Sequence, residues 1–90
     1  MSDSQLPEAM IKRYIERRQT DLAALEKAFA QKEWETFCRV GHQLKGNAAT
    51  FEFFDLETLG IELEKAGETK NEKEAERLLS AFGKWISARS

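Results

Sequence analysis

The sequence has little of what anchors or cross-links many small proteins. Its 90 residues include one cysteine, one proline and one histidine. A single cysteine excludes an internal disulfide and gives no support to an oxidising compartment. No apolar run approaches the roughly 20 residues of a membrane-spanning helix, and residues 1–7 do not resemble a signal peptide. We therefore expect a cytoplasmic protein without a membrane association.

Strong charge of one sign is missing as well. The formal net charge is −2, which gives no electrostatic case for binding nucleic acid. Four basic residues between positions 12 and 18 are interspersed with acidic ones, so they predict a mixed surface rather than a DNA-binding one. The chain also lacks a glycine-rich phosphate loop and a cluster of carboxylates, so we expect no ATP site, no metal site and no cofactor of its own. Its length predicts one domain, residues 1–90.

Apolar residues recur at helical spacing in four segments, and no segment alternates with the period of a strand. We expect helices from Pro7 to about Gln31, Glu33 to about Phe51, Asp55 to Ala66 and Asn71 to Ala88. Ser4 or Asp3 could cap the first helix, Asp55 the third, and Gly67 should end the third. Each helix should carry an apolar stripe, a line of apolar residues along one face. In the first helix the stripe is Ile11, Ile15, Leu22, Leu25 and Phe29, widened by Met10 and Tyr14, and in the second it is Trp34, Phe37, Gly41, Leu44, Ala48 and Phe51. In the third it is Leu56, Leu59, Leu63 and Ala66, and in the fourth Ala75, Leu78, Leu79, Phe82, Trp85 and Ile86.

Four such helices with short connections bury their stripes most simply against one another. The predicted fold is all-α, an antiparallel up-down four-helix bundle. The first helix is the longest, so its N-terminal segment should overhang and cap one end. A closed core of this kind predicts a monomer.

The single histidine lies on the polar side of the second helix. At about 100° per residue, the apolar stripe points roughly 130° away from His42, which predicts an exposed imidazole. A neutral imidazole keeps a lone pair and can act as a nucleophile. Lys45 and Gly46 share this side: the lysine is a cation that can attract a phosphoryl group, and the glycine leaves a notch for a partner. Four further residues around His42 are expected to bind that partner: Cys38, Arg39, Gln43 and Ala49.

The run His42-Gln43-Leu44-Lys45-Gly46-Asn47-Ala48 resembles the signature of histidine-containing phosphotransfer (HPt) domains. The similarity continues through Phe51, Phe53 and Leu56 to the pairs Leu59-Gly60 and Leu63-Glu64, and covers essentially the whole chain. Two positions differ. Asn47 stands where the family more often has serine or alanine. Glu52 stands where it often has glycine, so a positive φ in that turn would strain the backbone.

The resemblance implies that the chain is a phosphoryl carrier rather than an enzyme. His42 would accept a phosphoryl group from a phosphoaspartate on a response-regulator receiver domain and pass it to another receiver. Lys45 would lie near the phosphoryl oxygens, and Gly46 would admit the receiver. The expected partners are receiver domains, a hybrid histidine kinase, or both, and the required Mg²⁺ would belong to the receiver.

Other interpretations remain open at this stage. The bundle could bind a receiver or kinase without transferring phosphate. Cys38 and His42 are four residues apart on one face with Glu35 nearby, which could supply part of a zinc or copper site. Ile61 lies opposite the stripe of its helix, so we expect it to be exposed and to mark a docking surface.

Overall fold

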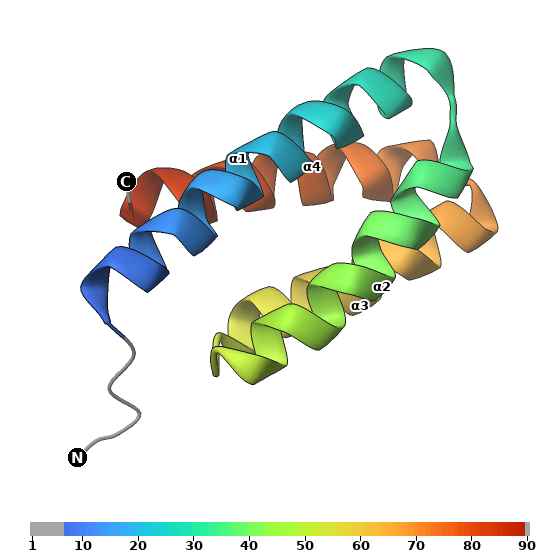
Figure 1. The fold of residues 1–90 in the computed structure, drawn as a ribbon. Helices are drawn as coiled ribbons and strands as arrows, with labels where there is room; N and C mark the ends of the chain where they lie inside the picture. Colours follow the sequence, from blue (N-terminus) through green and yellow to red (C-terminus); the bar gives the residue numbers. More distant parts are fainter. Residues whose placement is uncertain (1–6, 90) are drawn as a thin grey trace.

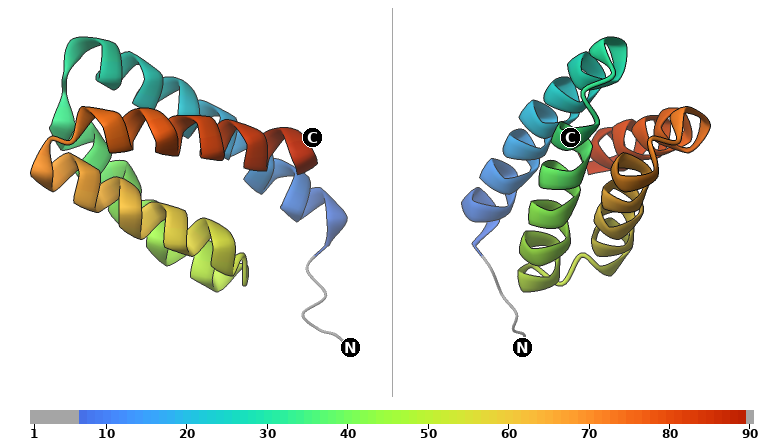
Figure 2. Two further views of the ribbon diagram at one scale, coloured as in Figure 1. Left: turned by 180° about the vertical axis from the view of Figure 1, so that it is seen from behind. Right: turned by 90° about the vertical axis from the view of Figure 1, so that its right-hand side faces the viewer.

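The computed structural model describes residues 7–89, which form four helices and no strand. Helix α1 spans Glu8–Gln31, α2 Trp34–Thr50, α3 Phe54–Thr69 and α4 Glu72–Arg89. Successive helices run in opposite directions, so the chain forms an antiparallel up-down bundle (Figures 1 and 2). Each helix packs against two others in the cyclic order α1, α2, α3, α4. The predicted fold class is therefore confirmed.

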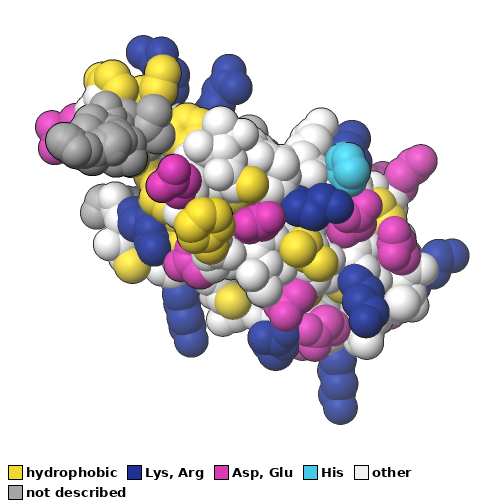
Figure 3. Space-filling model, turned by 90° about the horizontal axis from the view of Figure 1, so that it is seen from below, with side chains coloured by type: hydrophobic (Ala, Val, Ile, Leu, Met, Phe, Trp, Pro, Cys, Tyr) yellow, Lys and Arg dark blue, Asp and Glu magenta, His cyan; other side chains and the backbone are white. Residues whose placement is uncertain are grey.

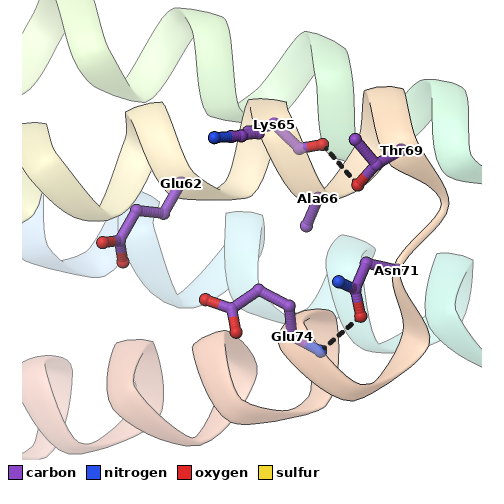
Figure 4. A pocket seen from close by; sticks show the side chains of 6 residues that line it. All are labelled: Glu62, Lys65, Ala66, Thr69, Asn71 and Glu74. Carbon is purple, nitrogen blue, oxygen red and sulfur yellow. Dashed lines mark hydrogen bonds between the residues drawn. The ribbon is translucent and has the colours of Figure 1, made fainter.

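Most helix ends fall within two residues of the predicted positions. Pro7 precedes α1, and its carbonyl oxygen accepts hydrogen bonds from the backbone N–H groups of Met10 and Ile11. The predicted caps Ser4 and Asp3 lie outside the described residues. Asn71 precedes α4, and its side-chain oxygen accepts a 3.0 Å hydrogen bond from the backbone N–H of Glu74 (Figure 4). This side-chain cap satisfies one of the donors that a helix N-terminus leaves unpaired.

The third helix begins within one residue of the predicted position, but the predicted cap Asp55 and the predicted end at Gly67 are wrong. Helix α3 begins at Phe54, so Asp55 lies inside its first turn, where its carboxylate accepts a 3.1 Å hydrogen bond from Nε1 of Trp85. The helix also continues past Gly67 to Thr69, and the residue that caps it is Lys70, which has a left-handed φ of 53°. The missing side chain of Gly67 serves packing instead, because a Cβ there would lie 2.8 Å from the backbone nitrogen of Cys38.

Two further glycines bring α2 and α3 together at backbone distance. A Cβ on Gly41 would lie 2.5 Å from the backbone nitrogen of Glu64 and 2.7 Å from the carbonyl oxygen of Gly60. A Cβ on Gly60 would lie 2.7 Å from the backbone nitrogen of Lys45. Real Cβ atoms do not approach backbone this closely, so both positions require glycine for this helix spacing.

The predicted stripes form the core. Phe37, Leu44, Leu56, Leu63, Leu78 and Phe82 are fully buried, together with Leu25 of α1. Two residues of α1 differ from expectation. Met10 does not widen the stripe, because it is 46% exposed, whereas Arg18 is buried beside Asp21. Val40 is also buried, although it was not part of the predicted stripe.

Aromatic side chains close the two ends of the bundle. At the α2–α3 turn, Tyr14 of α1 stacks on Phe51 with ring centroids 4.3 Å apart, and Phe53 contacts Trp85 at 5.3 Å. Tyr14 of α1 therefore packs against both aromatic residues of the α2–α3 turn, whereas residues 8–10 at the start of α1 are exposed. Trp34 lies at the opposite end, where α2 begins after the α1–α2 turn (Figure 1), and packs against Phe29 and Phe37.

Candidate functional site

His42 projects from the middle of α2 into solvent. Its side chain is 67% exposed, because the residues that face the core from this helix, among them Leu44 and Ala48, lie on other sides of it. In Figure 3 the single histidine stands at the surface beside basic and acidic side chains. The prediction of an exposed imidazole is confirmed, and a group of a second protein can reach the ring without any change in the bundle.

Glu64 of α3 lies beside the imidazole. Its Oε2 is 3.4 Å from Nδ1 of His42, and its Oε1 is 3.7 Å from Nζ of Lys45. The carboxylate therefore contacts both groups and partly balances the charge of Lys45. The close approach at Gly41 makes this possible, because it places the backbone of Glu64 directly against α2.

The sequence reasoning did not include Glu64 among the site residues. The angular positions of residues around a helix relate residues of that one helix only. Glu64 belongs to α3 and reaches the site because Gly41 lets α3 approach α2 closely. Two signals could have indicated it. The pair Leu63-Glu64 belongs to the resemblance, and Glu64 directly follows a core leucine, so it had to lie near the edge of the α2–α3 interface.

The other predicted site residues surround His42 on different sides. Arg39, Gln43 and Gly46 are exposed, and a Cβ on Gly46 would meet nothing within 4 Å, so the space around this position is open. Ala49 is half-buried. Cys38 turns toward α3, with its Sγ 3.9 Å from the carbonyl oxygen of Glu64, and burial raises the pKa of its thiol.

Comparison with protein families agrees with this geometry. Residues 9–88 match the family model described as "Hpt domain". The chain belongs to the Hpt domain family. Members of this family carry phosphoryl groups on histidine in phosphorelays, without an ATP site of their own, and interact with receiver domains and histidine kinases. No curated protein and no solved structure matches the chain significantly.

A partly buried polar network ties α1 of this Hpt domain to the site helix. The hydroxyl group of Tyr14 donates a 2.6 Å hydrogen bond to the side-chain oxygen of Asn47. The guanidinium group of Arg18 lies over the Tyr14 ring, and its Nε is 3.0 Å from Oδ2 of Asp21. Burial raises the pKa values of Tyr14 and Asp21, although Arg18 acts in the opposite direction on both. These contacts hold α2 in place on the side that faces α1.

The outer face of α3 carries two exposed apolar side chains. Ile61 is 46% exposed, as predicted, and Phe54 is 63% exposed. They are two helical turns apart, and Glu64 follows Ile61 by three residues, so all three lie on neighbouring parts of one helix face. This face of α3 therefore carries one exposed apolar side chain beside the α2–α3 turn and another nearer His42, with the polar residues Glu57 and Thr58 between them.

A separate hollow lies between α3 and α4 (Figure 4), lined by Glu62, Lys65, Ala66, Thr69, Asn71 and Glu74. Arg77 forms ion pairs with both Glu62 and Glu74, so the two carboxylates already have a cationic partner. Within residues 7–89, no group of three or more histidine, cysteine, aspartate or glutamate side chains is arranged to hold a metal ion. No helix in that range could cross a membrane.

Proposed function

We propose that His42 is the phosphoacceptor of this Hpt domain and that it relays a phosphoryl group between two receiver domains. One observation supports this most: an exposed imidazole whose Nδ1 lies against the carboxylate of Glu64. An Nδ1–H group directed at Glu64 leaves the lone pair on Nε2, the nitrogen farther from the backbone. A ring held in this tautomer presents its nucleophilic atom to an approaching partner.

Nε2 of His42 attacks the phosphorus atom of the receiver's aspartyl phosphate in line with the bond that breaks. A bond forms between nitrogen and phosphorus as the bond between phosphorus and the aspartate oxygen breaks, and the electron pair leaves on the aspartate carboxylate. The imidazole keeps its proton on Nδ1 and becomes positively charged. The carboxylate of Glu64 lies where it stabilises that charge.

Lys45 and Gly46 act on the phosphoryl group and on its approach. The ammonium group of Lys45 attracts the phosphoryl oxygens and stabilises the charge that spreads over them during transfer. Gly46 leaves open space one turn from His42, so that the partner's backbone can come close. Mg²⁺ would be held by the receiver, and this chain contributes position and exposure.

Docking would use the surface around His42. Arg39, Gln43 and Ala49 of α2 lie on the same exposed face or at its edge, and Cys38 borders α3. On the other side, Ile61 and Phe54 supply apolar area, because exposed apolar side chains gathered along one helix face are typical of binding surfaces.

The decisive experiment follows phosphate onto the chain. Purified receiver domains, phosphorylated with radiolabelled acetyl phosphate, are mixed with the wild-type chain and with His42→Gln. Wild type should acquire a label that is labile in acid and stable in base, as expected for phosphohistidine, whereas His42→Gln should remain unlabelled with an unchanged helical spectrum. If the wild-type chain binds receivers without acquiring label, it is an interaction module. A labelled His42→Gln variant would exclude His42 as the acceptor.

Glu64→Gln and Lys45→Ala separate the two supporting roles. Glu64→Gln keeps the shape but removes the charge, so transfer should slow by about tenfold, and imidazole nitrogen NMR shifts should report a larger share of the Nε2–H tautomer. Lys45→Ala should slow transfer without changing that tautomer ratio. Unchanged shifts in Glu64→Gln would show that Glu64 does not orient the ring.

A further inference from the structure

Two adjoining open hollows follow the line where α1 packs against α2. Their volumes are about 380 and 570 Å³, and both are lined by Arg17, Arg18 and Asn47. Arg13 borders the first hollow and Gln43 the second. We call this surface, formed by Arg13, Arg17 and Arg18 of α1 with Gln43 and Asn47 of α2, the arginine groove.

The arginine groove is basic although the whole chain has a net charge of −2. Among the described residues that line it, Asp21 alone is acidic, and Nε of Arg18 lies 3.0 Å from its carboxylate. Arg13 and Arg17 are exposed, and Arg17 also acts electrostatically on Asp21. Arg39 of α2 adds a further cation that acts on Asp21. Arg18 is itself buried, so the excess positive charge that the groove presents to solvent comes mainly from Arg13 and Arg17.

The arginine groove is continuous with the surface around His42. Angles around the axis of an ideal helix, measured from His42, show this. Gly46 lies at about 40° and Arg39 at about 60°. Gln43 and Asn47 lie further round in the same direction, at about 100° and 140°. Gln43 and Asn47 line the groove, so this direction is toward α1. Gly46 has no side chain to separate the two surfaces. A protein seated on His42 therefore covers the edge of the groove as well.

We propose that the arginine groove is a second docking contact that selects, by charge, receiver domains with an acidic surface beside the phosphorylation site. This inference rests on the proposed phosphotransfer function, because the partner at the groove is the one that delivers its phosphoryl group to His42. Exposed charges of this kind act mainly on the rate of encounter and on the choice of partner. The groove would favour acidic receivers over neutral or basic ones that fit Phe54 and Ile61 of α3 equally well.

The test compares two double charge reversals. Arg13→Glu/Arg17→Glu alters the groove, whereas Lys73→Glu/Lys84→Glu changes the net charge equally on α4, a helix that does not contact α2. All four side chains are exposed. Transfer from a panel of receivers, phosphorylated with radiolabelled acetyl phosphate, is measured as a function of receiver and salt concentration.

At low salt, the groove variant should lower kcat/KM at least about tenfold for the receivers that serve wild type best, mainly through KM. Because the Debye length falls to about 3 Å at 1 M salt, the difference in kcat/KM between the groove variant and wild type should nearly vanish at that salt concentration. The proposal would be overturned if the groove and control variants had the same kcat/KM, or if the loss of kcat/KM in the groove variant persisted at high salt. Absence of transfer to wild type would instead overturn the phosphotransfer function itself.

Discussion

Glycine-to-alanine substitution should change stability in opposite directions at positions 41 and 46, which lie five residues apart on α2. At Gly46 the new methyl group meets nothing within 4 Å. Alanine is favoured over glycine inside a helix by about 1 kcal/mol. Gly46→Ala should therefore raise the free energy of unfolding by about 1 kcal/mol, which corresponds to a rise in Tm of about 4–8 °C for a domain of this size.

At Gly41 the same helical preference is opposed by a clash. The methyl group would lie 2.5 Å from the backbone nitrogen of Glu64 and 2.7 Å from the carbonyl oxygen of Gly60. Backbone atoms cannot rotate away, so α2 and α3 must separate. Overpacking of this severity costs roughly 3 kcal/mol, the upper end of the usual range. After subtraction of the helical gain of about 1 kcal/mol, Gly41→Ala should lower stability by about 2 kcal/mol and Tm by about 8–16 °C.

Urea unfolding followed by circular dichroism at 222 nm, a standard wavelength for helix, measures both variants under identical conditions. The transfer assay adds a second readout. Gly46→Ala should be more stable yet slower in accepting phosphate, because its methyl group occupies the space left for the partner. Gly41→Ala should be less stable and should also lose the contact between Glu64 and His42. Equal or greater stability of Gly41→Ala would refute the close approach of α2 and α3.

Three further substitutions or reactions test separate contacts. Tyr14→Phe removes the hydrogen bond to Asn47 and should lower the free energy of unfolding in urea by about 1 kcal/mol; no change would show that this bond contributes nothing net. Glu52 has a φ of 62°, so Glu52→Gly should relieve strain and raise stability by about 0.5–1 kcal/mol, and a loss would contradict strain at this turn. Burial raises the pKa of the Cys38 thiol, so its reactive thiolate is depleted at about pH 8, and iodoacetamide should alkylate the folded chain more slowly than the urea-unfolded chain. Equal rates would exclude this protection.

The helices were predictable because apolar spacing reports directly which side of a helix faces the core. The same periodicity placed His42 opposite that side, and exposure followed without any knowledge of the neighbouring helices. The resemblance indicated a turn at Glu52 in which glycine is usual, and Glu52 has the positive φ, 62°, for which strain was expected. The helices and the exposure of His42 share one property: each follows from the geometry of a single helix.

Features that depend on two helices at once were not predicted. Gly67 follows a helical stripe and therefore resembled a C-terminal cap, but it allows α2 to approach α3. Arg18 interrupted the stripe of the first helix, and its burial depends on Asp21 and on the ring of Tyr14. Glu64 was missed for the same reason. The relative position of packed helices is set by side-chain volumes across the interface, which spacing within one helix does not contain.

The two tryptophans lie at opposite ends of the bundle, Trp34 beside Phe29 and Phe37, and Trp85 beside Phe53. The protein therefore contains two intrinsic fluorophores, one at each end of the bundle. Replacing either one with phenylalanine leaves a single emitter whose fluorescence describes one end. Quenching by iodide, recorded separately for each emitter, would reveal whether fraying starts where α1 meets α2 or at the turn that leads into α3.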